Sequence, residues 1–545
     1  MFLKPESTGQ LLVTLIDQYA ALDPSPTWAV VPIDQENLSL GFKDVSYREL
    51  SAAVSIAAFW LQSKLPLLTE ALETIAYTGP KDVRYPIFAI AAAKVGRKLL
   101  LPSPFASTGA QAHLVKASEC RTFLYGGELG ETVQRVLDLA GDERGRSLQV
   151  PELEQLFGEH TSPLFPYEKS WNQAKDDPWL IFHTSGTTGM PKLVTYSQKM
   201  MASLDAAKSM PDAHEETMSD HFSRRRWYTP LPSLHFVGMT VSLQFPLFCG
   251  SVVIIGPATS GPTTPSVAAE VLRHSKAEGV VLPPALIDGL CNNPDGLECL
   301  RNLKYIYFAG APLMSLTAAK LIDYVSVHPA MGSTEAGAYF IRITGTEDWE
   351  YYSFRPGMGM ELQHVAPGSE LHEAVFVRKS ELEQWQQVFH VYPQLQEFRT
   401  GDLFTRHPTR PDAWKYVGRT DDMIPFSHGE NLYVADIETE ITTSHPAISA
   451  AQVGGQGRSK PYLLVEWSTD SGSLSDAQKL HILQPVLARA NERCSDLVKL
   501  SRDLILFTHA EKPLMRTLKG SVSRLQSEEL YRMEIEQLYR CSKAN

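Results

Sequence analysis

The feature of this sequence that most constrains its fold is a regular alternation of strand-like and helix-like segments. Between residues 252 and 325, short apolar runs alternate with segments whose apolar residues recur at helical spacing. Strands separated by helices pack most simply as parallel neighbours in layers. The alternation therefore predicts an α/β fold. The expected strands are 252–255, 279–282 and 305–308, and the expected helices are 267–277, 285–291 and 316–325.

The same alternation occurs near the start of the chain, and the pattern changes twice afterwards. From residue 376 the sequence shows short strands with polar turns, and after about residue 420 a small mixed segment follows. We predict a large N-terminal core of layered β-sheets and helices, residues 1–418, and a small mobile α+β C-terminal lobe, residues 419–545. Expected elements are helices 47–65, 85–95, 434–443 and 477–494, and strands 75–77, 98–101, 450–453, 462–467 and 503–507.

Charge and composition exclude several classes of function. The net charge of -12 argues against a nucleic-acid partner, which requires a basic face. No apolar run approaches the roughly 18 residues needed to span a membrane, and the N-terminus lacks the pattern of a secretory signal. The six cysteines are scattered without a CxxC pair. We therefore expect a cytoplasmic protein with reduced thiols and no membrane partner.

The stretch HTSGTTGMPK, residues 183–192, has the composition of a phosphate-binding loop. It lies between apolar runs at 179–182 and 193–196, as expected for a hairpin. Glycines permit close backbone approach, and hydroxyls with one cation complete a concave anion site. It is not a Walker loop, because Pro191 precedes the lysine, and a flexible polar loop is the alternative. The candidate residues are Thr184, Ser185, Gly186, Thr187, Thr188, Gly189 and Lys192.

Two further segments have the features of a ligand site. In TPLPSLHFVGMT, residues 229–240, His235 follows a proline-rich turn and Gly238 allows close approach, although a structural histidine is the simpler alternative. In YFAGAPL, residues 307–313, a strand ends in small residues against which a flat base can lie. The alternative is an ordinary strand-to-helix turn. The small residues are Ala309, Gly310, Ala311 and Pro312.

Acidic residues occur in two other segments. In MGSTEAGAYF, residues 331–340, Thr334 is placed to bond a phosphate and Glu335 to bind Mg²⁺, although the stretch also suits a helix N-cap. Asp402 follows a glycine and is placed to accept the hydroxyls of a ribose, with an Asx-type turn as the alternative.

A hinge and a lysine complete the candidates. The run Gly418-Arg419-Thr420-Asp421 stands where the composition changes, which suits a hinge. Lys519 lies beside Gly520 in RTLKGSVSR, residues 516–524, on a predicted mobile loop; an exposed lysine without a role is the alternative.

Together and in this order, these segments resemble the adenylate-forming enzymes: acyl-CoA synthetases, luciferases and nonribosomal peptide synthetase adenylation domains. SGTTGMPK is similar to the family's phosphate loop, GSTEAG to its Thr-Glu motif, RTGD to its ribose motif and GRTDD to its hinge. The resemblance covers nearly the whole chain. It is closest to adenylation domains of fungal synthetase-like carboxylic acid reductases, through FRTGDLFTRHPTRPDAWKYVGRTDDMIPFSHGENLYVADIE and the Lys-Gly order of RTLKGSVSR.

The resemblance implies activation of a carboxylic acid by ATP and Mg²⁺, with Thr334, Glu335, His235 and Lys519 as catalytic residues. It also implies that Asp421 is the hinge and that Glu335 ligates the metal. The nucleotide would be bound by Asp402 and Arg419, together with the phosphate loop at 183–192 and Gly310–Pro312. The sequence departs from its relatives in HGENLYV, where the reductases often have NGEKLNP, and at Met515, where proline is usual. A further departure is Pro425 after Ile424, where peptide synthetases have lysine. These changes bear on how the lobe meets a carrier domain.

The prediction of the acid substrate depends on one aspartate that this sequence lacks. Relatives that activate amino acids have an aspartate just after the aromatic of the segment near His235, whereas Phe236 follows here. This favours an acid without a free α-amine, with aryl acids ranked before aryl-keto, short aliphatic and quaternary-ammonium acids. The expected pocket residues are His235, Phe236, Gly238, Met239, Ala309, Gly332 and Ala338.

The expected acceptor is the phosphopantetheine thiol of a carrier domain. The chain contains no Asp-Ser carrier motif and no dinucleotide fingerprint, and its last helix, expected at 528–539, ends in a polar tail. We expect that a carrier domain once followed residue 545. The enzymatic alternative is a free-standing acyl-CoA ligase. The non-enzymatic alternative is an adenylate-binding regulatory protein, which the presence of Lys519, Glu335 and Asp402 together disfavours.

Overall fold

The computed structural model describes most of the chain and divides it into two compact units. The first comprises Met1–Glu361, Phe376–Phe398 and Arg406–Lys415, and the second comprises Leu362–Val375, Arg399–Thr405 and Tyr416–Asn545. The boundary between Gly418 and Arg419 stays a prediction. The described residues are 9–66, 72–141, 145–158, 163–184, 190–212, 215–258, 261–366, 369–427, 431–468, 474–492, 494, 496–516 and 522–542.

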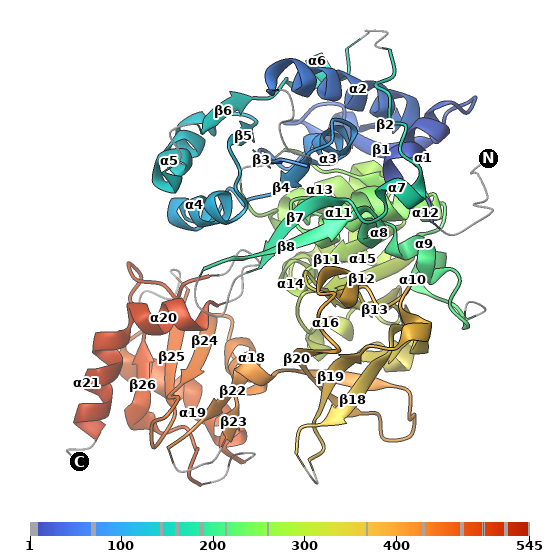
Figure 1. Cartoon of the computed structure of the whole chain (residues 1–545). Coiled ribbons are helices and arrows are strands. Elements are labelled where there is room, and N and C mark those ends of the chain that lie inside the picture. Colours follow the sequence, from blue (N-terminus) through green and yellow to red (C-terminus); the bar gives the residue numbers. More distant parts are fainter. Residues whose placement is uncertain are drawn as a thin grey trace. The chain divides into compact units, whose positions relative to one another are not determined.

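A seven-stranded sheet forms one half of the first unit (Figure 1). Its strand order is β13-β12-β11-β9-β10-β1-β2, and every neighbouring pair is parallel except β1 and β2. The predicted parallel α/β layering is therefore confirmed. The strands are β1 (Thr27–Pro32), β2 (Phe42–Ser46), β9 (Arg226–Tyr228), β10 (Val252–Ile254), β11 (Gly279–Leu282), β12 (Tyr305–Ala309) and β13 (Ser326–Ala330).

Helices α13, α14 and α15 pack on this sheet through a continuous apolar core. The predicted helix 316–325 is wrong in extent, because α16 ends at Ala318. Beyond it, Lys320, Leu321 and Tyr324 each donate to the residue three positions earlier, so the chain continues as tight turns. The helices are α13 (Pro265–Ser275), α14 (Pro284–Cys291), α15 (Pro294–Arg301) and α16 (Ser315–Ala318).

A six-stranded sheet forms the other half of the first unit. Its order is β6-β5-β3-β4-β7-β8, parallel from β6 to β7, while β8 is antiparallel to β7 as the predicted hairpin requires. The strands are β3 (Thr74–Thr78), β4 (Lys98–Leu100), β5 (Thr122–Tyr125), β6 (Arg146–Gln149), β7 (Pro178–Thr184) and β8 (Lys192–Ser197).

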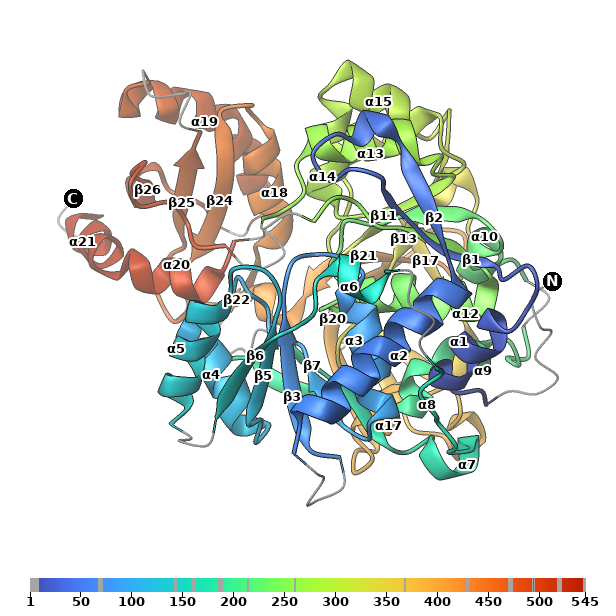
Figure 2. The same cartoon turned by 90° about the horizontal axis from the view of Figure 1, so that it is seen from above.

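Helices cover both faces of the six-stranded sheet (Figure 2). Helix α2 begins with a capping box between Ser46 and Glu49, and all eleven residues of α3 are buried, which explains its alanine-rich composition. Phe88 of α3 stacks on Tyr77 of β3 with ring centroids 5.3 Å apart. The opposite face packs on α4 and α5. The bounds are α2 (Tyr47–Lys64), α3 (Arg84–Lys94), α4 (Thr108–Ala117) and α5 (Gly130–Ala140).

Shorter helices of this unit lie between these elements. Helix α12 is followed by Gly250, whose φ of 69° is the left-handed conformation that glycine adopts just after a helix C-terminus. The bounds are α1 (Leu12–Ala20), α6 (Leu153–Leu156), α7 (Trp171–Ala174), α8 (Gln198–Met201), α9 (Ser203–Ala207), α10 (Met218–Phe222), α11 (Phe236–Met239), α12 (Phe245–Cys249) and α17 (Val388–Val391).

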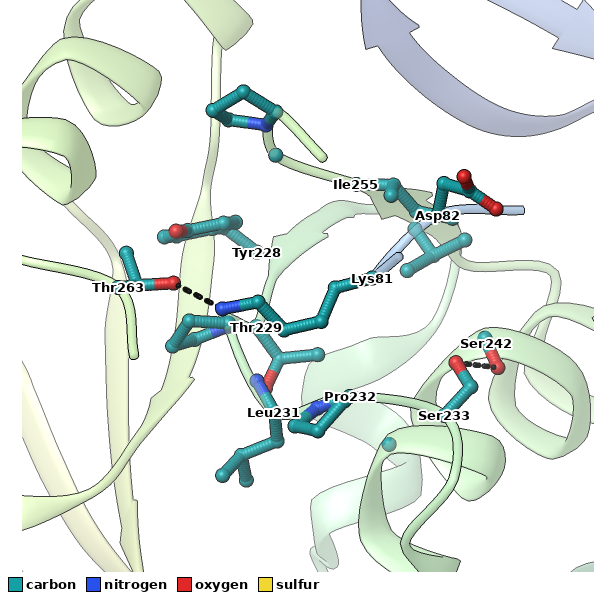
Figure 3. A pocket seen from close by; sticks show the side chains of 15 residues that line it. Lys81, Asp82, Tyr228, Thr229, Leu231, Pro232, Ser233, Ser242, Ile255 and Thr263 are labelled. Carbon is teal, nitrogen blue, oxygen red and sulfur yellow. Dashed lines mark hydrogen bonds between the residues drawn. The ribbon is translucent and has the colours of Figure 1, made fainter. Parts of the chain in front are cut away.

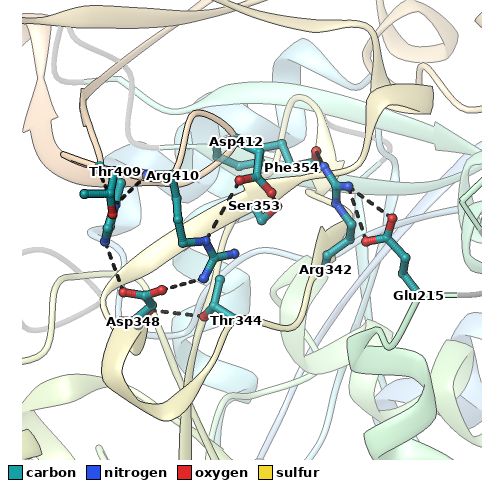
Figure 4. Close-up of polar contacts among 10 residues, drawn as sticks. Glu215, Arg342, Thr344, Asp348, Ser353, Phe354, Thr409, Arg410 and Asp412 are labelled. Atoms are coloured by element: carbon teal, nitrogen blue, oxygen red, sulfur yellow. Dashed lines mark hydrogen bonds and ion pairs between the residues drawn. The ribbon is translucent and has the colours of Figure 1, made fainter.

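A third sheet has the order β16-β17-β21-β20-β19-β18. Buried Asp348 anchors the loop after β20, because it accepts a 3.2 Å hydrogen bond from His407 and pairs with Arg410 (Figure 4). In the same region Ser353 donates to Asp412 at 3.1 Å. The strands are β16 (Ile341–Arg342), β17 (Tyr351–Phe354), β18 (Met360–His364), β19 (His372–Val377), β20 (Glu397–Arg406) and β21 (Trp414–Arg419).

The second unit contains a three-stranded sheet, β24-β25-β26, between two pairs of helices. Alternate residues of β25 face opposite cores: Leu463 and Val465 pack with α18 and α19, whereas Tyr462 and Leu464 pack with α20 and α21. The bounds are β22 (Met423–Pro425), β23 (Asn431–Tyr433), β24 (Ile448–Gly454), β25 (Tyr462–Trp467), β26 (Ile505–Phe507), α18 (Ala435–Thr443), α19 (Asp476–Glu492), α20 (Arg524–Leu530) and α21 (Arg532–Ser542).

The predicted helix 528–539 is interrupted at Tyr531, which separates α20 from α21. The Tyr531 ring is fully buried, and its hydroxyl donates to the backbone oxygen of Lys512. Anchoring this side chain in the core sets the position where the helix breaks. Among the described helices, none combines the length and apolarity needed to cross a bilayer.

Candidate active site

The carboxyl ends of parallel strands bring three of the predicted segments to one edge of the seven-stranded sheet. Strands β12 and β13 are neighbours, with Ala309 opposite Ala330. The residues after β12 therefore lie beside those after β13. Strand β9 leads into Thr229 at the same edge, one strand beyond β11. Open α/β sheets bind ligands at this edge.

The segment after β12 presents an open backbone. Gly310 has a φ of 92°, a conformation that residues other than glycine rarely adopt, and among the described residues beyond its two chain neighbours no atom lies within 4 Å of the position a Cβ would take. Gly310, Ala311 and Pro312 are exposed, and Ala309 is half-buried. A planar group can therefore lie flat against this backbone.

The segment after β13 forms a hairpin rather than the alternative helix N-cap. Strands β14 (Gly332–Ser333) and β15 (Gly337–Ala338) pair antiparallel, with Thr334 and Glu335 in the turn. The Tyr196 hydroxyl donates to the backbone oxygen of Thr334 at 2.8 Å, which ties the turn to β8. Burial, and then the Glu335 charge, raise the pKa of Tyr196, so its hydroxyl stays a donor.

Glu335 has the features of a cation ligand. Its side chain is half-buried, and within the described ranges no lysine, arginine or histidine forms an ion pair with it. A carboxylate in that position, beside the Thr334 hydroxyl, supplies the oxygen donors that Mg²⁺ prefers, with phosphate oxygens completing the shell. The residues of this turn therefore fit a magnesium ion.

The segment after β9 packs tightly against the hairpin. His235 is half-buried at the start of α11, and its backbone N–H donates to Pro232 at 3.0 Å. A Cβ on Gly238 would come within 2.3 Å of the Pro232 oxygen, and one on Gly332 within 3.0 Å of the Phe236 ring. The structure thus brings together four predicted pocket residues, His235, Phe236, Gly238 and Gly332. Half-buried Ala338 lies opposite Gly332 in the hairpin, and Met239 of α11 is fully buried.

The edge of the six-stranded sheet carries the ends of the predicted phosphate loop. Thr184 and Lys192 stand opposite each other where β7 meets β8; Thr184 is half-buried and Lys192 exposed. Ser185, Gly186, Thr187, Thr188 and Gly189 lie outside the described residues.

Two side chains near this loop were missed by sequence reasoning, His183 and Tyr196. His183 accepts a 3.2 Å hydrogen bond at Nε2 from the N–H of Ser103, which lies in the segment after β4. Burial lowers its pKa to about 4, so it is neutral near pH 7. His183 is the first residue of the quoted loop, but its partner Ser103 is eighty residues away in sequence, and no local signal predicts the pair.

In the second unit, Asp402 and Arg419 form an ion pair at 3.2 Å. Asp402 is 7% exposed and lies within β20, so the alternative of an Asx-type turn is wrong. Gly401 before it has a φ of 76°, and its N–H donates to Glu373 at 3.2 Å. This unusual conformation in mid-strand sets the direction of the Asp402 side chain.

The predicted hinge is a short 3-10 helix, Thr420–Asp422, after β21. The Arg419 N–H donates to Asp422 at 3.2 Å. Gly418 has a φ of 138°, and the Tyr433 ring covers it so closely that no other side chain fits there. The strand therefore ends at a defined residue, and the 3-10 helix follows it directly.

Lys519 lies outside the described residues, but the segments that flank it are well defined. Arg516 and Val522 form an antiparallel bridge, and the Ser523 N–H donates to Met515 at 2.7 Å. Arg516 also pairs with Glu466 at 2.6 Å.

Comparisons with known proteins identify the family of the chain. The chain is an acid-activating, adenylate-forming ligase. It belongs to the AMP-binding enzyme family, whose pattern matches residues 26–366, and the pattern of the AMP-binding enzyme C-terminal domain matches residues 421–543. Among curated proteins it is similar to fungal enzymes of the nonribosomal-synthetase-like reductase type.

Two of these relatives are similar over almost the whole chain. A carboxylic acid reductase of Neurospora crassa is 28% identical over 98% of this chain and 51% of its own length. An isocyanide synthase–NRPS hybrid of Aspergillus fumigatus is 28% identical over 97% of this chain and 33% of its own length. The chain therefore spans about half, or less, of the curated relatives it matches.

Solved structures share the fold at low identity. ATP-bound MatB from Rhodopseudomonas palustris is 18% identical, with a TM-score of 0.70 over 96% of this chain and 100% of that one. An anthranilate CoA ligase in complex with anthranoyl-AMP is 14% identical, with a TM-score of 0.72 over 96% of this chain and 97% of that one. Both support a large N-terminal domain and a smaller C-terminal sheet domain.

Proposed function

We propose that this chain activates a carboxylic acid lacking a free α-amine, with aryl acids first, and transfers it to the phosphopantetheine thiol of a carrier domain. One observation supports this proposal: three segments lie together at one edge of the seven-stranded sheet. They are the open backbone at Gly310, the Thr334–Glu335 turn, and the segment that contains His235 and Phe236. A nucleotide, a cation and an acid can be held there together.

In the first half-reaction the carboxylate oxygen of the acid attacks the α-phosphorus of ATP. The bond from the α-phosphorus to the bridging oxygen breaks, and pyrophosphate leaves with its electron pair. The main barrier is electrostatic, because an anion approaches a polyanion, and preorganised positive groups are the usual solution. Lys192 and Lys519 supply positive charge, and the hydroxyls of the phosphate loop supply donors. Magnesium held by Glu335 would neutralise phosphate charge when bound.

Asp402 and Arg419 are proposed to position the ribose. A buried carboxylate accepts two adjacent hydroxyls well, and its pairing with Arg419 orients it. Gly310, Ala311 and Pro312 provide the backbone for the base. These roles determine binding geometry and do not require proton transfer.

In the second half-reaction the thiol sulfur attacks the acyl carbon and AMP leaves, while the thiol proton passes to solvent. We propose that the C-terminal lobe rotates about Asp421 between the two steps, which withdraws Lys519 and admits the thiol. The reductase-type relatives support a carrier-bound acceptor.

The test is ATP–pyrophosphate exchange with a panel of aryl, aryl-keto, short aliphatic, quaternary-ammonium and amino acids. We expect exchange with an acid lacking the α-amine. A radiolabelled acyl group should then load a phosphopantetheinylated carrier domain far faster than it forms free acyl-CoA, because a tethered thiol is presented at about millimolar concentration. Exchange with no acid would refute acid activation, and rapid acyl-CoA formation without carrier loading would instead assign the chain as an acyl-CoA ligase.

A further inference from the structure

A small cavity of about 40 Å³ lies where the carboxyl edges of the two parallel sheets of the first unit meet (Figure 3). Lys81 enters it from the loop after β3, Thr229 from the end of β9, and Ile255 from the end of β10. Of these three residues, only Thr229 belongs to a segment that the sequence singled out as a ligand site. The cavity therefore requires its own explanation.

Lys81 is the positively charged residue of this cavity. Its Nζ donates a 3.1 Å hydrogen bond to the hydroxyl of Thr263, and Figure 3 shows the side chain extended between Tyr228 and Thr229. Burial lowers the pKa of Lys81 to about 8, and among the residues the structure describes no carboxylate forms an ion pair with it. A partly buried ammonium without a counter-ion is costly, so an anion that enters the cavity is strongly favoured.

The carboxylate nearest in sequence does not neutralise Lys81. Asp82 also lines the cavity, but it is held by Arg84, whose Nη2 lies 2.7 Å from Oδ2 and whose Nε lies 3.1 Å from the same oxygen. On the opposite wall, the hydroxyls of Ser233 and Ser242 lie 3.1 Å apart and add donors. The cavity thus combines the Lys81 ammonium, which forms no ion pair with a described carboxylate, with hydroxyl groups, and both suit oxygen anions.

The cavity shares a wall with the predicted acid-binding segment. Leu231, Pro232, Ser233 and Gly238 line it, and all belong to the segment 229–240 that also carries His235 and Phe236. A volume of about 40 Å³ holds a few water molecules or one small anionic group, but not a whole acid. Only the far end of a substrate fits.

We propose that Lys81 and Thr263 bind a second anionic oxygen group of the acid, remote from the carboxylate that is activated, so that the substrate class is a dicarboxylic acid. This inference rests on the proposed function and deepens it. The ammonium and the hydroxyl hold the distal carboxylate, while the first carboxylate faces ATP. Selectivity for the diacid then comes from an ion pair that a monoacid cannot form.

The experiment compares matched acids in ATP–pyrophosphate exchange without any thiol: terephthalate against benzoate, and adipate against hexanoate. We expect the wild-type kcat/KM to favour the diacid in at least one pair, and Lys81→Met to lower the diacid-to-monoacid ratio by tenfold or more. Lys81→Arg should retain part of the preference. Lys116→Met, at an exposed position of α4, is the matched control and should leave the ratio unchanged.

Thr263→Val gives an independent variant in case Lys81→Met is unstable, and it should lower the same ratio by less. The ratio should also fall between pH 7 and 9, because Lys81 loses its charge over this range. Burial raises the pKa of Asp82, an effect that the Arg84 ion pair opposes, and burial also raises the pKa of Tyr228, so that this hydroxyl stays neutral.

Failure of the inference is distinguishable from failure of the proposed function. Exchange with monoacids but a ratio identical in wild type, Lys81→Met and Thr263→Val would overturn the diacid assignment and leave acid activation intact. An effect of Lys81→Met that occurs only in thiol transfer would also overturn it, because the anion bound by Lys81 would then belong to the acceptor. Exchange with no acid would refute acid activation itself.

Discussion

The hydroxyl of Tyr196 lies 2.8 Å from the backbone oxygen of Thr334. A residue of the six-stranded sheet therefore holds the turn that follows β13, the edge strand of the seven-stranded sheet. Tyr196 lies on β8, only four residues beyond Lys192, whereas Thr334 precedes the proposed magnesium ligand Glu335. This hydrogen bond therefore connects the proposed phosphate loop to the proposed metal-binding turn within the first unit.

Removing this hydrogen bond should loosen the turn. Tyr196→Phe keeps the ring but leaves the Thr334 carbonyl without its donor, so we expect a loss of about 0.5–1.5 kcal/mol in the free energy of unfolding. We also expect a higher KM for ATP, because the turn would then adopt more than one conformation. Urea unfolding and exchange kinetics measure both. Tyr324→Phe, at an exposed ring, is the control and should change neither.

Lys519 is predicted to act only in the first half-reaction. Lys519→Ala should slow adenylate formation by roughly two to three powers of ten, or about 2.7–4 kcal/mol, as the loss of one donor to a transition state does. Transfer from a preformed acyl-adenylate to the thiol should be nearly unchanged. Single-turnover measurements of the two steps check this, and equal damage to both would contradict the assignment.

Asp402 is predicted to recognise the ribose hydroxyls. Asp402→Asn removes the charge of a hydrogen-bond acceptor, which is typically worth about 1.5–3 kcal/mol, so KM for ATP should rise by roughly ten- to a hundredfold. The variant should also lose most of the wild-type discrimination against 2′-deoxy-ATP and 3′-deoxy-ATP. Asp476→Asn, at an exposed carboxylate, serves as the matched control. Unchanged discrimination in Asp402→Asn would remove Asp402 from the ribose site.

The hinge prediction separates the two half-reactions in the opposite sense. Asp421→Pro restricts φ to about -65° at the residue where rotation is needed, so thiol transfer should be blocked while adenylation continues. Asp421→Ala leaves the backbone free and should support both steps. Parallel assays of pyrophosphate exchange and carrier loading test this. Loading by the proline variant at the wild-type rate would show that rotation occurs elsewhere.

His183 should make the protein less stable in acid. Its folded-state pKa is about 4, below the ordinary 6.5, so the unfolded chain binds a proton more readily between these values. The neutral ring's contribution is fully present above pH 6.5 and is lost as the pH falls from 6.5 towards 4. His183→Gln should show a smaller loss of urea stability over this range. His113→Gln, at an exposed site, should behave like wild type.

Some helices and strands could be predicted correctly from the sequence, and others could not. Hairpin β7–β8, helix α3 and strands β11 and β25 follow their local patterns of apolar residues. The helix expected at 316–325 is shorter, and the helix expected at 528–539 is broken at Tyr531. The second error arises where the buried Tyr531 side chain is anchored to the backbone of Lys512, a contact that periodicity cannot register.

What the sequence alone determined is the class of the protein. The segments proposed to bind a phosphate, a ribose and a metal combine particular residue types at fixed local spacing, so SGTTGMPK, GSTEAG and RTGD can be recognised without a structure. Family membership followed from these segments, and the α/β fold followed from the alternation of strand-like and helix-like segments.

Only the tertiary structure decided which side chains meet. Ser103 contacts His183, Tyr196 contacts Thr334, and Lys81 bonds to Thr263, although each pair is separated by more than seventy residues. These contacts depend on which strands become parallel neighbours and where their carboxyl ends coincide. Strand order is set by burial of the whole sheet rather than by any local pattern, so the charged cavity of Lys81 has no signature in the sequence.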